Sequence, residues 1–187
     1  MEMATTRDDW IAAAYARFAD EGLSAVRIEP IARAIGATKG SFYWHFTDRQ
    51  ALIEAVMERW EQSETDAIIE VASAGTTPRE RLALLYRTVG ETSSRRRGEA
   101  SLYFEAAAHG VAAYVTRVSE RRVVHIASIL EEADIAPDEA RRRAVLSLAI
   151  GIGLEQLTTA TGLDVVGDTS ANSRQLTETA LRAALQP

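Results

Sequence analysis

The segment from Lys39 to His45 carries side chains that are unusual for an exposed helix. A helix face in water is normally covered by charged and polar residues, yet this segment holds no acidic residue. Phe42 and Phe46 lie four residues apart, so both are expected to face inward on the same side. The residues left to point outward are Lys39, Gly40, Ser41, Tyr43, Trp44 and His45.

These outward groups have the chemistry that contacts double-stranded DNA. An ammonium group at the start of a helix, such as that of Lys39, can donate to guanine O6 and N7 in the major groove. The hydroxyls of Ser41 and Tyr43, and the imidazole that follows them, can donate to phosphate oxygens. The indole of Trp44 can pack on a sugar or a thymine methyl, and Gly40 lets the backbone approach closely.

Two further points bear on this interpretation. Arg49 falls in the first turn of the next predicted helix, where its charge and the free backbone N–H groups could jointly hold a phosphate. On the other hand, Tyr43 and Trp44 could anchor a protein partner, because aromatic residues are often the anchors of protein interfaces. The residue types alone leave both interpretations open.

Three short helices must hold this segment in place. Helical spacing of apolar residues predicts them over residues 6–21, 29–35 and 38–46, with Gly36 ending the second and Thr38 capping the third. A tight turn joins the second helix to the third, which is a helix-turn-helix pattern. The residues expected in its core are Phe18, Ile31, Ala32, Ile35, Phe42, Phe46 and Leu52.

The rest of the chain is also expected to be helical, because apolar residues recur at spacings of three and four and strand signals are scarce. The fold class is therefore all-α, with about nine helices. We expect a helix-turn-helix module over residues 1–50 and a larger helical domain over 51–187. The further helices are predicted over 49–74, 78–92, 98–108, 111–133, 137–161 and 170–185.

Composition argues against several other classes of protein. The 187 residues include no Cys, and the three His are far apart without metal-ligand spacing, so we expect no disulfide and no metal site. No nucleophile elbow, phosphate loop or dinucleotide motif is present, so neither an enzyme nor a cofactor is expected. No apolar run suits a membrane span or a signal peptide, which predicts a cytoplasmic location. The net charge of −6 predicts weak non-specific binding to nucleic acid.

Residues 36–46, Gly-Ala-Thr-Lys-Gly-Ser-Phe-Tyr-Trp-His-Phe, followed by Asp-Arg-Gln-Ala-Leu at 48–52, resemble the signature of the TetR (tetracycline-repressor-like) family. Upstream, Phe18 with Gly22, and the pair Ile31-Ala32 with Gly36, are similar to it too. The resemblance covers about residues 7–56. The ending Tyr-Trp-His-Phe is what makes the motif specific.

The resemblance implies a role for individual positions. Lys39 and Ser41 would contact bases, aromatic residues 43–45 would contact both bases and backbone, and Arg49, where the family usually has Lys, would hold a phosphate. Arg27 stands where the family usually has a capping Thr or Ser; the cap is lost, but a phosphate contact could be gained. The predicted DNA-binding residues are Arg27, Thr38, Lys39, Gly40, Ser41, Tyr43, Trp44, His45 and Arg49.

For the remaining chain the resemblance implies a ligand-binding and dimerisation domain. Residues 146–154 are apolar on most sides and the last helix is amphipathic, so these two helices from each of two chains could form a four-helix interface. The alternative is that both helices belong to the core of one chain. The candidate dimer residues are Leu146, Ile150, Leu154, Leu157, Leu176 and Leu181.

Aromatic residues on the middle helices could line a pocket for a small-molecule effector. For each of them a packed core position is the alternative. Glu105 and Glu155, if turned inward, would favour a cationic effector. The candidate pocket residues are Tyr86, Tyr103, Phe104, Tyr114 and His125.

Together with the resemblance, these features predict a sequence-specific DNA-binding transcriptional regulator, a repressor relieved by an unknown small-molecule effector. A homodimer would present two recognition helices to successive major grooves of a palindromic operator, about 34–36 Å apart. The alternative function is an all-helical protein-interaction module that binds no DNA.

Overall fold

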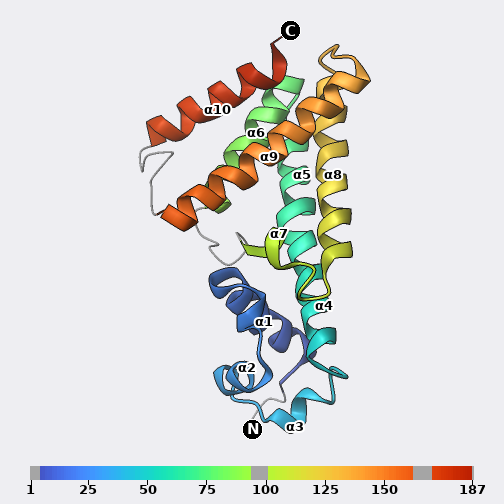
Figure 1. Ribbon diagram of the computed structural model, residues 1–187, viewed down its shortest axis with the longest axis vertical. Coiled ribbons are helices and arrows are strands. Elements are labelled where there is room, and N and C mark those ends of the chain that lie inside the picture. The colour runs from blue at the N-terminus through green and yellow to red at the C-terminus, as the bar shows by residue number, and fades with distance from the viewer. Residues whose placement is uncertain (1–4, 94–100, 162–169, 187) are drawn as a thin grey trace. The chain divides into compact units, whose positions relative to one another are not determined.

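The computed structural model describes residues 5–93, 101–161 and 170–186, and every regular element in these ranges is helical (Figure 1). The all-α prediction is therefore confirmed. The first elements are α1 (Arg7–Glu21), the 3-10 turn η1 (Leu23–Ala25), α2 (Ile28–Ala34), α3 (Lys39–Phe42) and α4 (Arg49–Glu61). They are followed by the π turn η2 (Gln62–Asp66), α5 (Ala67–Ser73), α6 (Pro78–Ser93), α7 (Leu102–Glu105), α8 (Ala112–Glu131), α9 (Pro137–Thr161) and α10 (Ser170–Leu185).

The chain divides into two compact units. Unit 1 consists of Met1–Gln62 with Arg96–Val115, and unit 2 consists of Ser63–Arg95 with Thr116–Pro187. The first unit thus extends past residue 50 and takes in α7. A hydrogen bond of 3.3 Å between Ser24 Oγ and His109 Nε2 joins the segment after α7 to the helix-turn-helix region within unit 1.

Local signals at the ends of α1 behave as the sequence indicates. Thr6 is the N-cap: its Oγ1 accepts from the backbone N–H of Asp9 at 3.2 Å, and the Asp9 carboxylate accepts from Thr6 N–H at 2.8 Å. These hydrogen bonds from Thr6 lower the pKa of Asp9. Gly22 ends the helix with φ 83°, in the left-handed region that favours glycine.

Aromatic rings form the centre of unit 1. Phe42 is fully buried; it meets Trp10 edge-on at a centroid distance of 5.2 Å and stacks on Phe46 at 5.4 Å. Such aromatic pairs add about 0.5–1.5 kcal/mol beyond the burial of their area. The sequence placed Phe42 and Phe46 in this core, but it did not single out Trp10. Other core side chains with no exposed area include Phe18, Ile31 and Leu52.

In unit 2, α6 packs against α5 and α10, and α10 also contacts α9 (Figure 1). The buried cluster between these helices and α8 consists of aliphatic side chains. At its margin the Tyr86 hydroxyl lies 3.0 Å from Ser147 Oγ, and burial raises the pKa of Tyr86. The core includes Ala72, Leu82, Ile126, Ile129, Leu130, Ala140, Ala144 and Leu181.

The single helix predicted over 49–74 is interrupted. The π turn at Gln62–Asp66 separates α4 from α5 and turns Thr65 and Glu64 into the interior. Arg122 holds this turn from α8, because its Nε donates to Thr65 Oγ1 at 3.0 Å and its Nη2 donates to the Glu64 carbonyl at 3.1 Å. A contact from a distant helix stabilises the turn, and helical periodicity carries no sign of such a contact.

Candidate nucleic-acid interface

The recognition segment is an α-helix of one turn followed by tighter turns. Thr38 Oγ1 accepts from Ser41 N–H at 3.1 Å, and Ser41 Oγ donates to the Thr38 carbonyl at 2.8 Å. Directly after Phe42 two backbone bonds span three residues, from Trp44 N–H to the Ser41 carbonyl and from His45 N–H to the Phe42 carbonyl, before Phe46 N–H donates to Phe42 across four. The prediction that the helix continues to Phe46 is therefore wrong, and α3 ends at Phe42.

The tightening does not change which residues face inward. Phe42 and Phe46 are buried, whereas Trp44 is 83% exposed and Tyr43 is 53% exposed. Half of Tyr43 is covered because its ring meets Phe42 edge-on at 5.2 Å. The exposed side of this segment therefore carries an indole that is largely exposed and a phenol that is half exposed.

Gly40 lies on the same exposed side. A Cβ built there would meet only Thr38 Oγ1 at 3.7 Å, an ordinary contact. Packing within the chain therefore does not require glycine at this position. By contrast, Gly36 adopts φ +68° in the turn between α2 and α3, which most other residues would adopt only with strain.

Lys39 forms an ion pair that the sequence did not suggest. Its Nζ lies 2.8 Å from Glu29 Oε1, and both side chains are more than half exposed. The hydrogen bond to Lys39 lowers the pKa of Glu29, and the same bond raises the pKa of Lys39. Glu29 is in the first turn of α2, so the pair joins the two helices of the motif.

His45 and Arg49 both have partners inside unit 1. His45 Nε2 lies 2.9 Å from the Thr5 carbonyl, so this nitrogen carries the hydrogen and donates it. Arg49 donates from Nε to the Val26 carbonyl at 2.6 Å and from Nη2 to the Leu23 carbonyl at 2.9 Å. The predicted contacts of these two residues with phosphate stay predictions. In the structure each side chain also holds a backbone carbonyl of unit 1.

Arg49→Met should destabilise unit 1 by about 1–2 kcal/mol, because two half-buried carbonyls of the η1 turn would lose charged donors. Urea denaturation followed by circular dichroism measures this loss. Arg59→Met, on the exposed face of α4, is the control, although its loss of the contact with the Tyr15 ring should cost a little. A variant as stable as wild type would mean that Arg49 does not hold the turn.

Arg27 is exposed at the N-cap position of α2, and its side chain makes no capping hydrogen bond, as expected for an arginine. Its contact with phosphate also stays a prediction.

In the described residues no group of His, Asp and Glu side chains is placed to hold a metal ion. No helix in the described part of the chain has the length and hydropathy of a membrane span.

The candidate pocket residues fall in different units. Tyr103, Phe104 and Tyr114 belong to unit 1, where Phe104 is exposed and the other two are half-buried. Tyr86 and His125 belong to unit 2. Burial lowers the pKa of His125, whose buried Nε2 has no hydrogen-bond partner among the described residues. Of the two acids considered for a cationic effector, Glu105 is half-buried, and the side chain of Glu155 lies outside the described residues.

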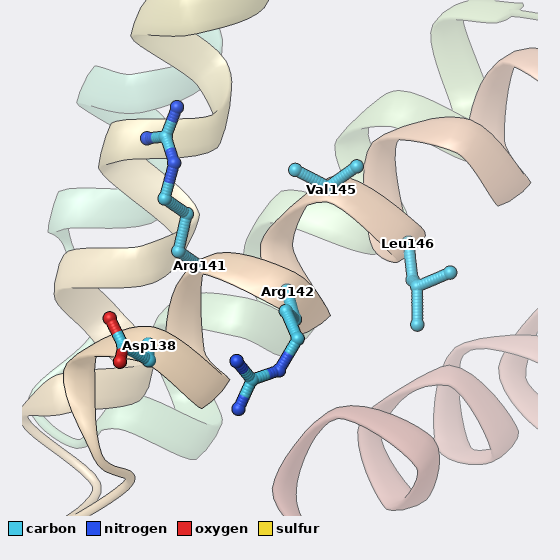
Figure 2. Close-up of a pocket in the computed structure, with 5 residues that line it drawn as sticks. All are labelled: Asp138, Arg141, Arg142, Val145 and Leu146. Atoms are coloured by element: carbon cyan, nitrogen blue, oxygen red, sulfur yellow. The ribbon is translucent and has the colours of Figure 1, made fainter.

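The candidate dimer residues form an exposed apolar stripe on α9. Leu146, Ile150 and Leu157 are each more than half exposed, and Leu154 is half-buried between them. Leu146 also borders a shallow hollow of about 560 Å³ at the start of α9, with Val145, Asp138, Arg141 and Arg142 (Figure 2).

The two candidates on α10 differ. Leu176 is partly exposed, but Leu181 is buried in the core of its own unit. The amphipathic pattern of α10 did not distinguish the face that packs on α6 from the face left outside. Leu181 is therefore a core residue of the single chain. The exposed leucines of α9, by contrast, are not core residues of the single chain.

Comparison with known proteins finds a family match in the N-terminal part of the chain. The model described as "Bacterial regulatory proteins, tetR family" matches residues 11–56, which span the core and the exposed segment described above. These residues match the TetR family. The TetR-family match ends within α4, in unit 1.

Curated relatives agree with this assignment. The HTH-type transcriptional repressor KstR2 of Mycolicibacterium smegmatis is 28% identical over 104 residues, 56% of this chain and 51% of its own length. The HTH-type transcriptional regulator AcrR of Shigella flexneri is 35% identical over 65 residues, 35% of this chain and 29% of its own. The chain thus matches about half of the first relative's length and less than a third of the second's. Both are regulators and not enzymes.

Solved structures extend the likeness to the whole fold. A TetR transcriptional regulator from Legionella pneumophila has a TM-score of 0.75 at 17% identity, over 96% of this chain and 98% of its own. A transcriptional regulator from Rhodococcus sp. Rha1 has a TM-score of 0.77 at 19% identity, over 97% of each chain. The all-helical architecture of the TetR family is therefore shared beyond the matched segment.

Proposed function

We propose that this protein is a sequence-specific DNA-binding transcriptional regulator, a repressor that a small-molecule effector relieves. The observation that carries the proposal is the exposed face of α3 and the turns after it, where Trp44 is 83% exposed beside Tyr43. Large apolar rings left in water cost free energy, so a patch of them marks a contact surface. Lys39 on the same side supplies an ammonium donor suited to base edges and phosphates.

The alternative is a protein-interaction module anchored by the same rings. The TetR-family match over residues 11–56, which includes this face, favours DNA. Selection of bound duplexes from a random pool separates the two functions. A DNA reader enriches a consensus made of two related half-sites, whereas a protein-interaction module leaves the pool unchanged.

Lys39→Ala should relax the base preference at one position of each half-site, because a well-placed base contact is worth about 1–3 kcal/mol of discrimination. Repeating the selection with the variant gives the change in base frequencies. Arg17→Ala removes the same charge from a half-buried position on α1 and serves as the control. The role of Lys39 in base recognition is wrong if both variants select the wild-type consensus.

We further propose a homodimer that buries the exposed stripe of α9. Leu146, Ile150 and Leu157 recur at spacings of four and seven residues, so they lie along one side of the helix and can face the same stripe of a second copy. Such a dimer would hold two α3 segments for two half-sites about 34–36 Å apart.

The effector site is proposed for unit 2, where Tyr86 and Ser147 offer hydroxyls at the edge of an aliphatic core. An effector that binds better to a conformation unsuited to DNA would reduce operator affinity by linkage. A thermal-shift screen of apolar small molecules, followed by titration of each hit against the operator complex, tests this. Operator affinity that does not change when a hit is saturating would contradict relief by that compound.

A further inference from the structure

Glu29 places a carboxylate beside the positions proposed to contact DNA. It lies in the first turn of α2 and its Oε1 is 2.8 Å from Lys39 Nζ. An exposed ion pair of this kind contributes little to the stability of a fold. Near a phosphate backbone, moreover, a carboxylate repels the ligand. Its place in the first turn of α2 gives a small stabilising reason for an acid here, because a negative charge near a helix N-terminus is favourable. General attraction to DNA does not explain it.

The pair changes what Lys39 can do. A lysine ammonium is a point charge on a flexible stem of four carbons, so alone it can follow any nearby phosphate. The hydrogen bond to Glu29 holds the ammonium in one place. A distant phosphate feels little net attraction, because the charges of Lys39 and Glu29 are opposite and close together. Because each partner shifts the pKa of the other away from neutrality, both stay charged near pH 7.

We propose that Glu29 is a specificity-determining residue that acts with Lys39 to recognise a G·C base pair; this proposal rests on the DNA-binding function above. In the major groove guanine presents two adjacent acceptors, O6 and N7, and its cytosine presents the N4 amino donor. An ammonium beside a carboxylate offers the complementary donor and acceptor. An A·T pair also presents a donor, adenine N6, but it lacks the two adjacent acceptors on one base that the ammonium bridges in guanine. A phosphate or a thymine methyl gives the carboxylate no favourable partner.

Glu29→Gln tests the proposal, because it removes the charge and keeps the size of an exposed side chain. Fluorescence anisotropy is measured with the duplex selected by the wild-type protein and with a scrambled duplex of equal length, at several salt concentrations. We expect affinity for the scrambled duplex to rise about tenfold at 0.1 M salt, because the slope of log K against log salt should steepen by about 0.9 per bound subunit. Preference for the G·C pair over A·T at one half-site position should fall at least about threefold.

Glu21→Gln is the matched control. Glu21 is exposed and paired with Arg17 on α1 at 3.0 Å, so the substitution changes the net charge equally and breaks a similar pair. A double variant supplies a second test: in a Lys39→Gln background, Glu29→Gln should no longer alter base preference. Loss of that effect would support joint recognition, and persistence of the effect would overturn it.

The outcomes separate this proposal from the function on which it rests. If the wild-type protein selects a consensus and Glu29→Gln matches Glu21→Gln in scrambled-duplex affinity, salt slope and base preference, the role of Glu29 is overturned and the function stands. If the wild-type protein selects no sequence, both are overturned. Steeper salt dependence together with a weaker G·C preference, seen for Glu29→Gln alone, supports the role of Glu29.

Discussion

Phe42→Ala should lower the free energy of unfolding of unit 1 by about 3–5 kcal/mol. Phe42 has no exposed area and contacts the rings of Trp10 and Phe46, so its removal leaves a cavity among rigid neighbours. Since the free energy of unfolding of a small domain is only about 5–15 kcal/mol, this loss would leave the DNA-binding module close to unfolding at physiological temperature. Urea denaturation followed by circular dichroism and tryptophan emission measures it.

Two controls make the expectation specific. Trp44→Ala removes a larger side chain two residues away, but that side chain is exposed, so the cost should stay below about 0.5 kcal/mol. Phe42→Leu keeps most of the buried volume and should cost clearly less than Phe42→Ala. If Trp44→Ala proved as damaging as Phe42→Ala, the inward and outward assignment of this segment would be reversed.

Ile150→Glu should dissociate the proposed dimer. Ile150 is 55% exposed in the middle of the α9 stripe, with Leu146 and Leu157 on either side. A carboxylate buried against the same stripe of a second copy would lack a partner, and a change at such a central position costs about 2 kcal/mol or more, about 30-fold in the dimer dissociation constant. Sedimentation equilibrium over a range of concentrations measures the constant.

Val124→Glu is the matched control for this experiment. Val124 on α8 is 52% exposed, so the same charge enters an equally open apolar position away from the stripe. We expect this variant to dimerise like the wild type, and the monomeric Ile150→Glu to lose affinity for a two-half-site operator. A wild-type protein that is monomeric throughout, or a dimer that tolerates Ile150→Glu, would contradict the assignment of α9.

The sequence predicts most of the fold because local signals set the helix ends. Thr38 caps α3 as expected, Gly36 follows the end of α2 with φ +68°, and the bounds expected for α9 and α10 match those observed. These features depend on residues within one turn of each other. They can be found without knowing what packs against the helix.

The errors arise where distant residues decide the conformation. The π turn between α4 and α5 is held by Arg122, which is nearly sixty residues further along the chain. The early end of α3 follows from the tight turns that bring Phe46 beneath Phe42. Helical periodicity is almost the same with and without such turns, so it predicted continuous helices in both places.

In the candidate site, too, local spacing predicts some features and distant contacts decide others. The outward positions of Tyr43 and Trp44 follow from the spacing of Phe42 and Phe46, and the exposures agree. The ion pair of Glu29 with Lys39 was missed, because it joins residues ten apart across a turn of unknown geometry. For the same reason, the carbonyl partners of Arg49 could not be anticipated.

Acrylamide quenching of tryptophan fluorescence tests most directly whether the exposed face of α3 lies against DNA. Of the three tryptophans, Trp10 and Trp60 are buried and Trp44 is 83% exposed, so nearly all quenching should come from Trp44, and Trp44→Phe should abolish it. When the selected duplex is added to the wild-type protein, we expect this quenching to fall severalfold. A scrambled duplex at high salt should leave the quenching unchanged. Equal quenching of Trp44 in free and DNA-bound protein would contradict the account.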